Sequence, residues 1–159
     1  MMIELKKITW DNWRECMNLE IRADQKNFIA SNQYSLAQSY VALLNDEWPP
    51  RTYAIYDDDI LLGFTMFCYY TAEKNEYGDE PCYFIYRFMI DKKYQNKGFG
   101  RKALIKILEN IKTFPQGRVE SIYLSYEPSN TVARNLYQSL GFVETGQYAY
   151  DELVAKLVL

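Results

Sequence analysis

The chain has 159 residues, of which 48% are hydrophobic and 25% charged, and it carries a formal net charge of −3 at pH 7. That length and composition predict one domain, residues 1–159, with a core of ordinary size. The chain has no histidine, which excludes Ser-His-Asp and Cys-His catalysis and histidine-bound metals, and its pI of about 5.1 argues against broad binding of nucleic acid.

Neither a membrane segment nor a disulfide framework is expected. No apolar run reaches the length of a membrane span, and the first residues lack the apolar core of a secretory signal. Cys16, Cys68 and Cys82 are odd in number and widely spaced, so we expect reduced core residues rather than disulfides or a thiolate zinc site. These features predict a cytoplasmic protein without a bound metal.

The N-terminal part of the chain predicts a strand followed by a helix. Residues 2–8 alternate weakly in hydropathy, which is typical of a strand. Thr9 or Asp11 can cap the following helix, which we expect to end between residues 22 and 26. Its apolar surface is supplied by Trp10, Trp13, Met17, Leu19 and Ile21.

A second helix fits residues 35–44. Its predicted core face consists of Leu36, Tyr40, Val41 and Leu44. Pro49 and Pro50 bar the helix from continuing. Two β-rich runs, 52–56 and 60–70, flank the acidic turn 57–59 and predict a hairpin.

Residues 83–108 are the most informative stretch, because a strand, a glycine loop and a helix follow one another directly. An apolar strand at 83–90 leads through a basic turn into Gln95-Asn96-Lys97-Gly98-Phe99-Gly100. The helix that follows is predicted from apolar residues spaced by about three and four: Phe99, Ala103, Leu104, Ile107, Leu108 and Ile111.

This arrangement suits an anion. The free N–H groups and the positive dipole end of a helix's first turn attract a phosphate, and Gly98 and Gly100 let it approach the backbone closely. Residues 91–106 contain six cationic residues and one acid, a net +5, so the rest of the chain carries −8. The basic charge is therefore concentrated where a diphosphate would lie.

The last third of the chain predicts a strand, a helix and a strand pair. Residues 120–126 form the strand, and Pro128 prevents its continuation. Ser129 or Asn130 caps a helix that Gly141 ends. Runs 147–150 and 152–159 complete the predicted order β-α-α-β-β-β-α-β-α-β-β.

Two segments resemble the signature of the GCN5-related N-acetyltransferase (GNAT) family. Residues 95–100 match its acetyl-CoA-binding pattern, Gln/Arg-x-x-Gly-x-Gly/Ala, at every fixed position. Asn130-x-x-Ala133-x-x-Leu136-Tyr137-x-x-Leu140-Gly141-Phe142 resembles its other conserved segment. The resemblance implies an α/β fold with a twisted, mixed central sheet of about seven strands and helices on both faces. It also implies acetyl-CoA or coenzyme A as cofactor.

By this resemblance, cofactor contacts fall on the strand end, the glycine loop and the last helix. They are Phe88, Met89, Ile90, Gln95, Asn96, Lys97, Gly98, Phe99, Gly100, Arg101, Asn130, Arg134 and Tyr137. A backbone N–H at Met89 or Ile90 would stabilise the carbonyl oxygen of the tetrahedral intermediate. Tyr137 would protonate the leaving thiolate. Seven residues are almost two helical turns, which places Asn130 and Tyr137 on one face.

The acceptor is predicted from charge and from a closer resemblance. Negative charge outside the 91–106 segment favours a cationic acceptor. Over most of its length the chain is similar to bacterial spermine/spermidine (diamine) N-acetyltransferases, although those proteins often carry an acid where this chain has Tyr86. Candidate acceptor-site residues are Glu20, Asp24, Phe28, Asn32, Tyr86, Ser125 and Glu127. The pattern singles out no general base.

Two other functions remain open at this point. One is a drug or amino-acid/peptide N-acetyltransferase, and the other is a CoA-binding module without turnover, which the presence of both Asn130 and Tyr137 disfavours. The expected partner is a small-molecule amine, with no nucleic acid and no membrane. The family resemblance also suggests a possible homodimer.

Overall fold

The structure is a computed structural model and describes residues 2–159. It contains the predicted succession of elements, with 3-10 turns added at Ala23–Gln25 and Ala72–Lys74. The elements are β1 (Ile3–Lys7), α1 (Trp13–Met17), α2 (Asn32–Asn45), β2 (Arg51–Asp57), β3 (Ile60–Tyr70), β4 (Cys82–Ile90), α3 (Phe99–Ile111), β5 (Ser121–Tyr126), α4 (Thr131–Ser139), β6 (Val143–Ala149) and β7 (Glu152–Val158). Among the described residues, no helix combines the length and the apolar character needed to span a bilayer.

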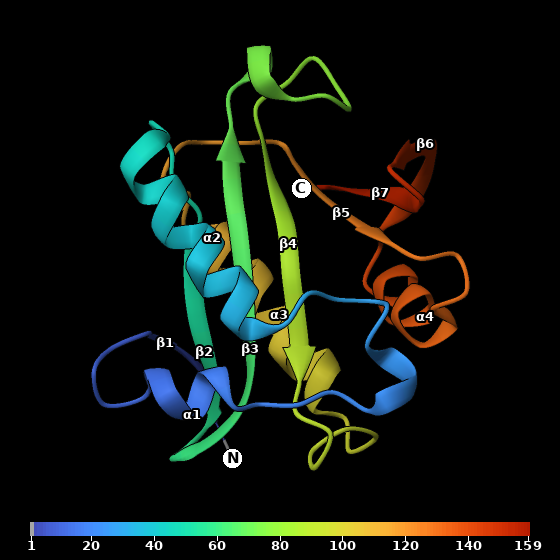
Figure 1. The fold of residues 1–159 in the computed structure, drawn as a ribbon. Coiled ribbons are helices and arrows are strands. Elements are labelled where there is room, and N and C mark those ends of the chain that lie inside the picture. The colour runs from blue at the N-terminus through green and yellow to red at the C-terminus, as the bar shows by residue number, and fades with distance from the viewer. Residues whose placement is uncertain (1) are drawn as a thin grey trace.

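All seven strands form one mixed sheet in the order β1-β2-β3-β4-β5-β7-β6. Neighbouring strands are antiparallel except β4 and β5, which are parallel. These two strands pair only over residues 82–85 and 121–124, and beyond that point they diverge (Figure 1). The second half of β4 therefore has a partner strand, β3, on one side only.

A β-bulge in β4 lies where the strands begin to diverge. Met66 of β3 is opposite Arg87, but Phe67 is opposite Ile85, so Tyr86 is the extra residue. A bulge bends its strand and redirects side chains. Tyr86 is accordingly exposed and Arg87 half-buried, in a strand that is buried at both ends.

Helices cover both faces of the sheet, as predicted (Figure 1). On one face, Leu104 and Ile107 of α3 belong to the same core cluster as Tyr137 of α4. On the other face, Cys16 of α1 packs in a smaller cluster with Met89 of β4. The buried residues of α3 are those of the predicted stripe, and all three cysteines are free and buried as expected.

The first helix is shorter than predicted. It begins at Trp13, with Asn12 rather than Thr9 or Asp11 as N-cap, and it ends at Met17 instead of between residues 22 and 26. The Asn12 side chain bonds backwards, accepting from the Thr9 N–H at 2.8 Å and donating to the Lys7 carbonyl oxygen at 3.0 Å. Because these bonds favour a turn over a helix, the segment before residue 13 stays non-helical.

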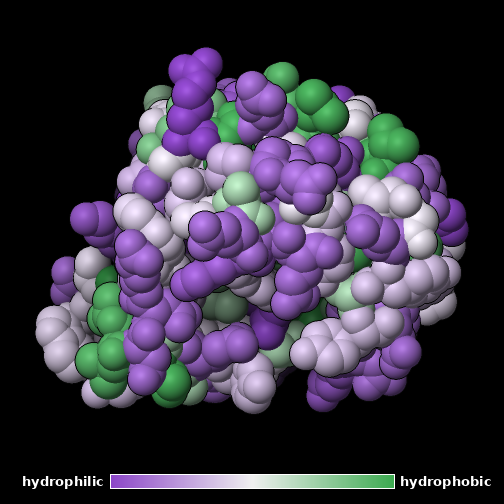
Figure 2. Space-filling view, turned by 90° about the horizontal axis from the view of Figure 1, so that it is seen from above, coloured by the Kyte–Doolittle hydropathy of each residue, from purple (hydrophilic) through white to green (hydrophobic). Residues whose placement is uncertain are grey.

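The predicted core face of α2 is wrong except at Leu36, which is half-buried and packs against the smaller core cluster. Tyr40, Val41 and Leu44 are 64%, 57% and 67% exposed, and the buried residues of the helix are the polar Asn32 and Ser35. Figure 2 shows hydrophobic side chains gathered at the lower left of the molecule, on the side where α2 lies in Figure 1.

The buried face of α2 carries polar side chains because polar groups lie opposite that face. Asn32 donates to the Cys16 carbonyl oxygen at 2.8 Å and contacts the Met89 sulfur at 3.8 Å. Ser35 Oγ accepts from Arg87 Nε at 3.1 Å. Buried donors and acceptors need such partners, and the spacing of apolar residues gives no sign of them.

Replacing Asn32 by alanine should lower the free energy of unfolding by about 1 to 2 kcal/mol, because a buried hydrogen bond is lost. Urea denaturation would measure this decrease in the free energy of unfolding. The exposed neighbour Gln33 supplies the matched control, since Gln33→Ala should change stability by less than about 0.5 kcal/mol. Equal unfolding midpoints for the two variants would contradict the assigned role of Asn32.

Candidate active site

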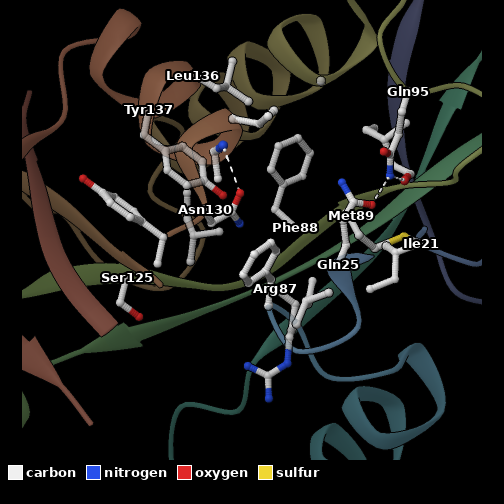
Figure 3. A pocket seen from close by; sticks show the side chains of 18 of the residues that line it. Ile21, Gln25, Arg87, Phe88, Met89, Gln95, Ser125, Asn130, Leu136 and Tyr137 are labelled. Carbon is white, nitrogen blue, oxygen red and sulfur yellow. Dashed lines mark hydrogen bonds between the residues drawn. The ribbon is translucent and has the colours of Figure 1, made fainter. Parts of the chain in front are cut away.

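The diverging ends of β4 and β5 border a cavity of about 520 Å³. Its walls come from residues 21–30, β4, the glycine loop, the end of β5 and α4. In Figure 3, Phe88 lies between Tyr137 and Asn130 on one side and Gln95 with Gln25 on the other. A cavity of this size, lined by both apolar side chains and converging polar groups, can hold a small molecule.

The glycine loop has the backbone shape of an anion site. Asn96 and Gly98 have positive φ angles of 59° and 80°, in alternation with residues of ordinary φ. That alternation lets successive N–H groups converge. Helix α3 starts at Phe99 without a side-chain cap, so the N–H groups of its first turn have no intrahelical partner.

Both glycines keep the approach to this loop open. A Cβ at Gly98 would meet no atom within 4 Å, and one at Gly100 would meet only Leu136 Cδ2 at 3.8 Å. Gly98 is required by its positive φ. At Gly100 the space is cavity, so any longer side chain would enter it.

Hydrogen bonds pin the 20–25 segment against the end of β4. Gln95 Nε2 donates to the Ile90 carbonyl oxygen and to Gln25 Oε1, both at 2.9 Å (Figure 3). The buried Asp91 accepts from the Glu20 N–H at 2.9 Å. Sequence reasoning missed these contacts because the partners are 70 and 71 residues apart.

Asn130 and Tyr137 both reach the cavity from α4, as their spacing predicts (Figure 3). Asn130 is the N-cap, and its Oδ1 accepts from the Ala133 N–H at 3.3 Å. Tyr137 is 9% exposed, with its ring 5.6 Å from that of Tyr126 and 6.0 Å from that of Phe142.

The phenol of Tyr137 is neutral at pH 7. Burial is the main cause that raises its pKa, and the nearby Glu152 and Tyr126 raise it further. A neutral phenol carries a proton that it can donate, whereas a phenolate could only accept one.

The end of β4 lines the cavity with both side-chain and backbone atoms. Phe88 projects into the cavity (Figure 3), while the Met89 side chain is 6% exposed and packs under α1 and α2. The Met89 side chain therefore lies mainly outside the cavity. Because no strand pairs β4 on the β5 side beyond residue 85, backbone groups there are available to an extended ligand.

Five residues expected at the cofactor do not line the cavity: Lys97, Gly98, Phe99, Arg101 and Arg134. The first four lie in the loop and first turn of α3. Arg101 donates to Ser139 Oγ at 2.6 Å. Arg134 forms an ion pair with Glu144, with Nε and Oε1 2.7 Å apart, and so faces β6.

A second cavity, of about 540 Å³, adjoins the first. Four residues line both: Tyr86, Arg87, Ser125 and Glu152. The remaining wall comes from α2, the end of β3, the β3–β4 connection and the turn between β6 and β7. Five tyrosines line this second cavity, namely Tyr34, Tyr70, Tyr77, Tyr86 and Tyr150, together with two acids, Glu76 and Glu152, and two cations, Lys74 and Arg87.

The two carboxylates of that wall are balanced by its two cations, and its tyrosines add no negative charge. Burial raises the pKa of Tyr70, Tyr77 and Tyr86, so these phenols are neutral at pH 7. The Tyr70 and Tyr86 hydroxyls are hydrogen-bonded to each other. Glu76 is exposed at the rim, whereas Glu152 is half-buried between the cavities.

Three of the expected acceptor-site residues line a cavity: Phe28, Tyr86 and Ser125. Four do not: Glu20, Asp24, Asn32 and Glu127. Glu20 pairs with Lys92, and Asp24 pairs with Arg22 at 3.2 Å. Within residues 2–159, no three His, Cys, Asp or Glu side chains gather in a way that could hold a metal ion.

Sequence reasoning missed Glu152 and most of the tyrosine wall. These residues come from α2, three strands and two connections, and no motif links them. The one available signal was composition, since the chain contains fifteen tyrosines.

Comparison with known proteins agrees with the two motifs. The family model described as "Acetyltransferase (GNAT) family" matches residues 6–142. The spermine/spermidine N(1)-acetyltransferase of Bacillus subtilis (strain 168) is 27% identical over 151 residues, covering 95% of this chain and 94% of that protein.

Two solved structures share the fold. The PaiA N-acetyltransferase of Thermoplasma acidophilum, in complex with coenzyme A, has a TM-score of 0.69 at 15% identity, with 100% of both chains covered. The spermidine N-acetyltransferase of Vibrio cholerae, in complex with CoA and spermine, has a TM-score of 0.69 at 20% identity, covering 99% of this chain and 94% of that one.

Proposed function

The chain belongs to the acetyltransferase (GNAT) family, and from that premise we propose that it moves an acetyl group from acetyl-CoA to a primary amine of a polyamine such as spermidine or spermine. Family membership makes it an acetyl-CoA-dependent N-acetyltransferase. The acceptor and the residue roles are the proposal. We also infer that residues 1–159 act as a single domain, since one sheet includes strands from Ile3 to Val158.

The first cavity fits the donor. Its glycine loop offers converging N–H groups and a local charge of +5 to the diphosphate. The free edge of β4 can pair with the pantetheine arm. The observation that carries the proposal is that this loop, this edge and Tyr137 border one cavity, which leads on to the second.

The transfer requires two proton movements. An alkyl ammonium has a pKa near 10.4, so only roughly one molecule in a few thousand is nucleophilic at pH 7. After the amine attacks the thioester carbon, a backbone N–H at Met89 or Ile90 stabilises the carbonyl oxygen. The C–S bond then breaks, and the sulfur takes the proton of Tyr137.

The second cavity fits a polyamine acceptor. Aromatic faces and carboxylates attract ammonium groups, and neutral phenols can accept hydrogen bonds from them. The net charge of −8 outside residues 91–106 favours cations in the same way. The relative from Bacillus subtilis is named for spermine and spermidine, and the Vibrio cholerae structure contains spermine.

A second candidate acceptor is an amino acid or peptide. Arg87 lines both cavities and donates only to neutral groups, Ser35 Oγ, Gln38 Oε1 and the Tyr86 carbonyl oxygen. An arginine without an acidic partner can bind a carboxylate of the acceptor.

Filling the cavity at Gly100 should weaken coenzyme A binding. Gly100→Leu is expected to raise the Kd by more than about tenfold, which corresponds to about 1.4 kcal/mol. Gly100→Ala is the control, because its Cβ fits at 3.8 Å from Leu136, and its Kd should stay near that of the wild type. Calorimetric titration measures both, and wild-type affinity in the leucine variant would refute this position for the diphosphate.

Removing the hydroxyl of Tyr137 should slow the reaction without weakening donor binding. Tyr137→Phe is expected to lower kcat by roughly ten- to several-hundred-fold while the Kd for acetyl-CoA stays similar, since the ring packing is kept. Tyr148→Phe, at an exposed position on β6, should leave both unchanged. A fully active Tyr137→Phe enzyme would remove the phenol from the mechanism.

Thiol release from acetyl-CoA across a panel of amines tests the acceptor. We expect spermidine and spermine to have the highest kcat/KM, ahead of lysine peptides, free amino acids and aminoglycosides. A preference for amino acids or peptides that is lost in Arg87→Gln would support the second candidate. Coenzyme A binding with no turnover of any amine would overturn both.

A further inference from the structure

The two cavities meet at a carboxylate that no other residue neutralises. Glu152 lies at the start of β7 and lines both cavities. Its Oε2 accepts a hydrogen bond from Ser125 Oγ at 2.6 Å. Within the described residues, no lysine or arginine forms an ion pair with Glu152.

Glu76 of the second cavity also has no ion pair among the described residues, but it is exposed, whereas Glu152 is half-buried and the other acids near the site are paired. Glu20 pairs with Lys92, Glu80 with Lys156 and Glu144 with Arg134. A carboxylate without a cationic partner is open to an arriving ammonium group, which it can bind through a charge-assisted hydrogen bond. Glu152 can therefore bind a cationic group of a ligand, because no cationic side chain of the described residues is paired with it.

Its position is also close to the reacting atoms of the proposed function. The negative charge of Glu152 raises the pKa of Tyr137 in the first cavity and that of Tyr77 in the second, with burial the larger cause in each case. Its field therefore acts both on the phenol that faces the thioester and on the wall that would hold the acceptor.

We propose that Glu152, oriented by Ser125, binds the acceptor's reacting ammonium group and accepts its proton. This inference rests on the proposed N-acetyltransferase function but does not depend on the acceptor being a polyamine. Ser125 acts as a positioning residue, because its hydroxyl donates to Oε2, and Oε1 accepts no hydrogen bond from the described residues.

The protons balance in this scheme. The ammonium gives one proton to Glu152, which passes it to solvent through the second cavity. The neutral nitrogen forms the N–C bond, the C–S bond breaks, and the sulfur takes the Tyr137 proton. The nitrogen's second proton then restores the phenol, so an amide and a free thiol form and one proton is released.

The test is Glu152→Gln, which keeps the shape of the side chain and removes its charge. We expect kcat/KM for the amine to fall by about a hundredfold or more at pH 7, while the Kd for coenzyme A changes by less than about twofold. The loss should shrink as pH rises toward 9, because free amine then needs no base. Ser125→Ala should lower kcat/KM less, and its loss should also shrink with rising pH.

Asp151→Asn is the matched control, since it removes one negative charge from the exposed neighbouring residue and should leave kcat/KM unchanged. Glu152→Asp keeps the charge and serves if the glutamine variant does not fold. Wild-type kcat/KM with an unchanged pH profile in Glu152→Gln would overturn the proposal. The kcat/KM values are measured with the amine that the wild type acetylates fastest. If spermidine is not a substrate, that result contradicts only the polyamine as acceptor and not the role of Glu152.

Discussion

The structure depends on the divergence of two parallel strands. β4 and β5 pair over four residues each and then diverge, with Tyr86 bulged out of β4 just past the last pair. A continuous ladder would leave no free backbone edge and no cavity between the strands. The bulge also turns Tyr86 and Arg87 toward both cavities. One interruption of hydrogen bonding thus creates the donor cavity and joins it to the second one.

The two cavities also differ in the charged residues near them. The basic segment 91–106 surrounds the start of α3, while the carboxylates Glu76 and Glu152 lie in the wall of the second cavity. The second cavity also contains Lys74 and Arg87, so its ionised side chains balance, and only the start of α3 has an excess of one sign that would attract the anionic donor. Tyr137 and Glu152 both line the first cavity, and Glu152 also lines the second, so the proposed acid and base lie where the two cavities adjoin.

Local signals in the sequence were enough to predict the element order, the α3 stripe and part of the wall of the first cavity. The glycine loop, the α3 stripe and the pair Asn130 and Tyr137 each lie within one short segment, so their geometry follows from helical spacing and backbone rules. The second cavity could not be predicted in this way, because Glu152 and its tyrosines come together only through sheet topology.

Helices α1 and α2, on the other face of the sheet, also could not be predicted fully from local signals. The apolar stripe of α2 is periodic yet mostly exposed, since Asn32 and Ser35 form hydrogen bonds to Cys16 and Arg87 that no local pattern reveals. Asn12 likewise bonds back to the residues before it, which shortens α1. In both cases a specific hydrogen bond outweighed apolar periodicity.

Hydrogen–deuterium exchange with and without coenzyme A tests the central claim most directly, because it reports which backbone amides a ligand covers. Slower exchange confined to residues 88–90 and 97–101 is the predicted result. Coenzyme A that fails to bind, or that protects amides elsewhere and leaves the start of α3 unchanged, would contradict this account.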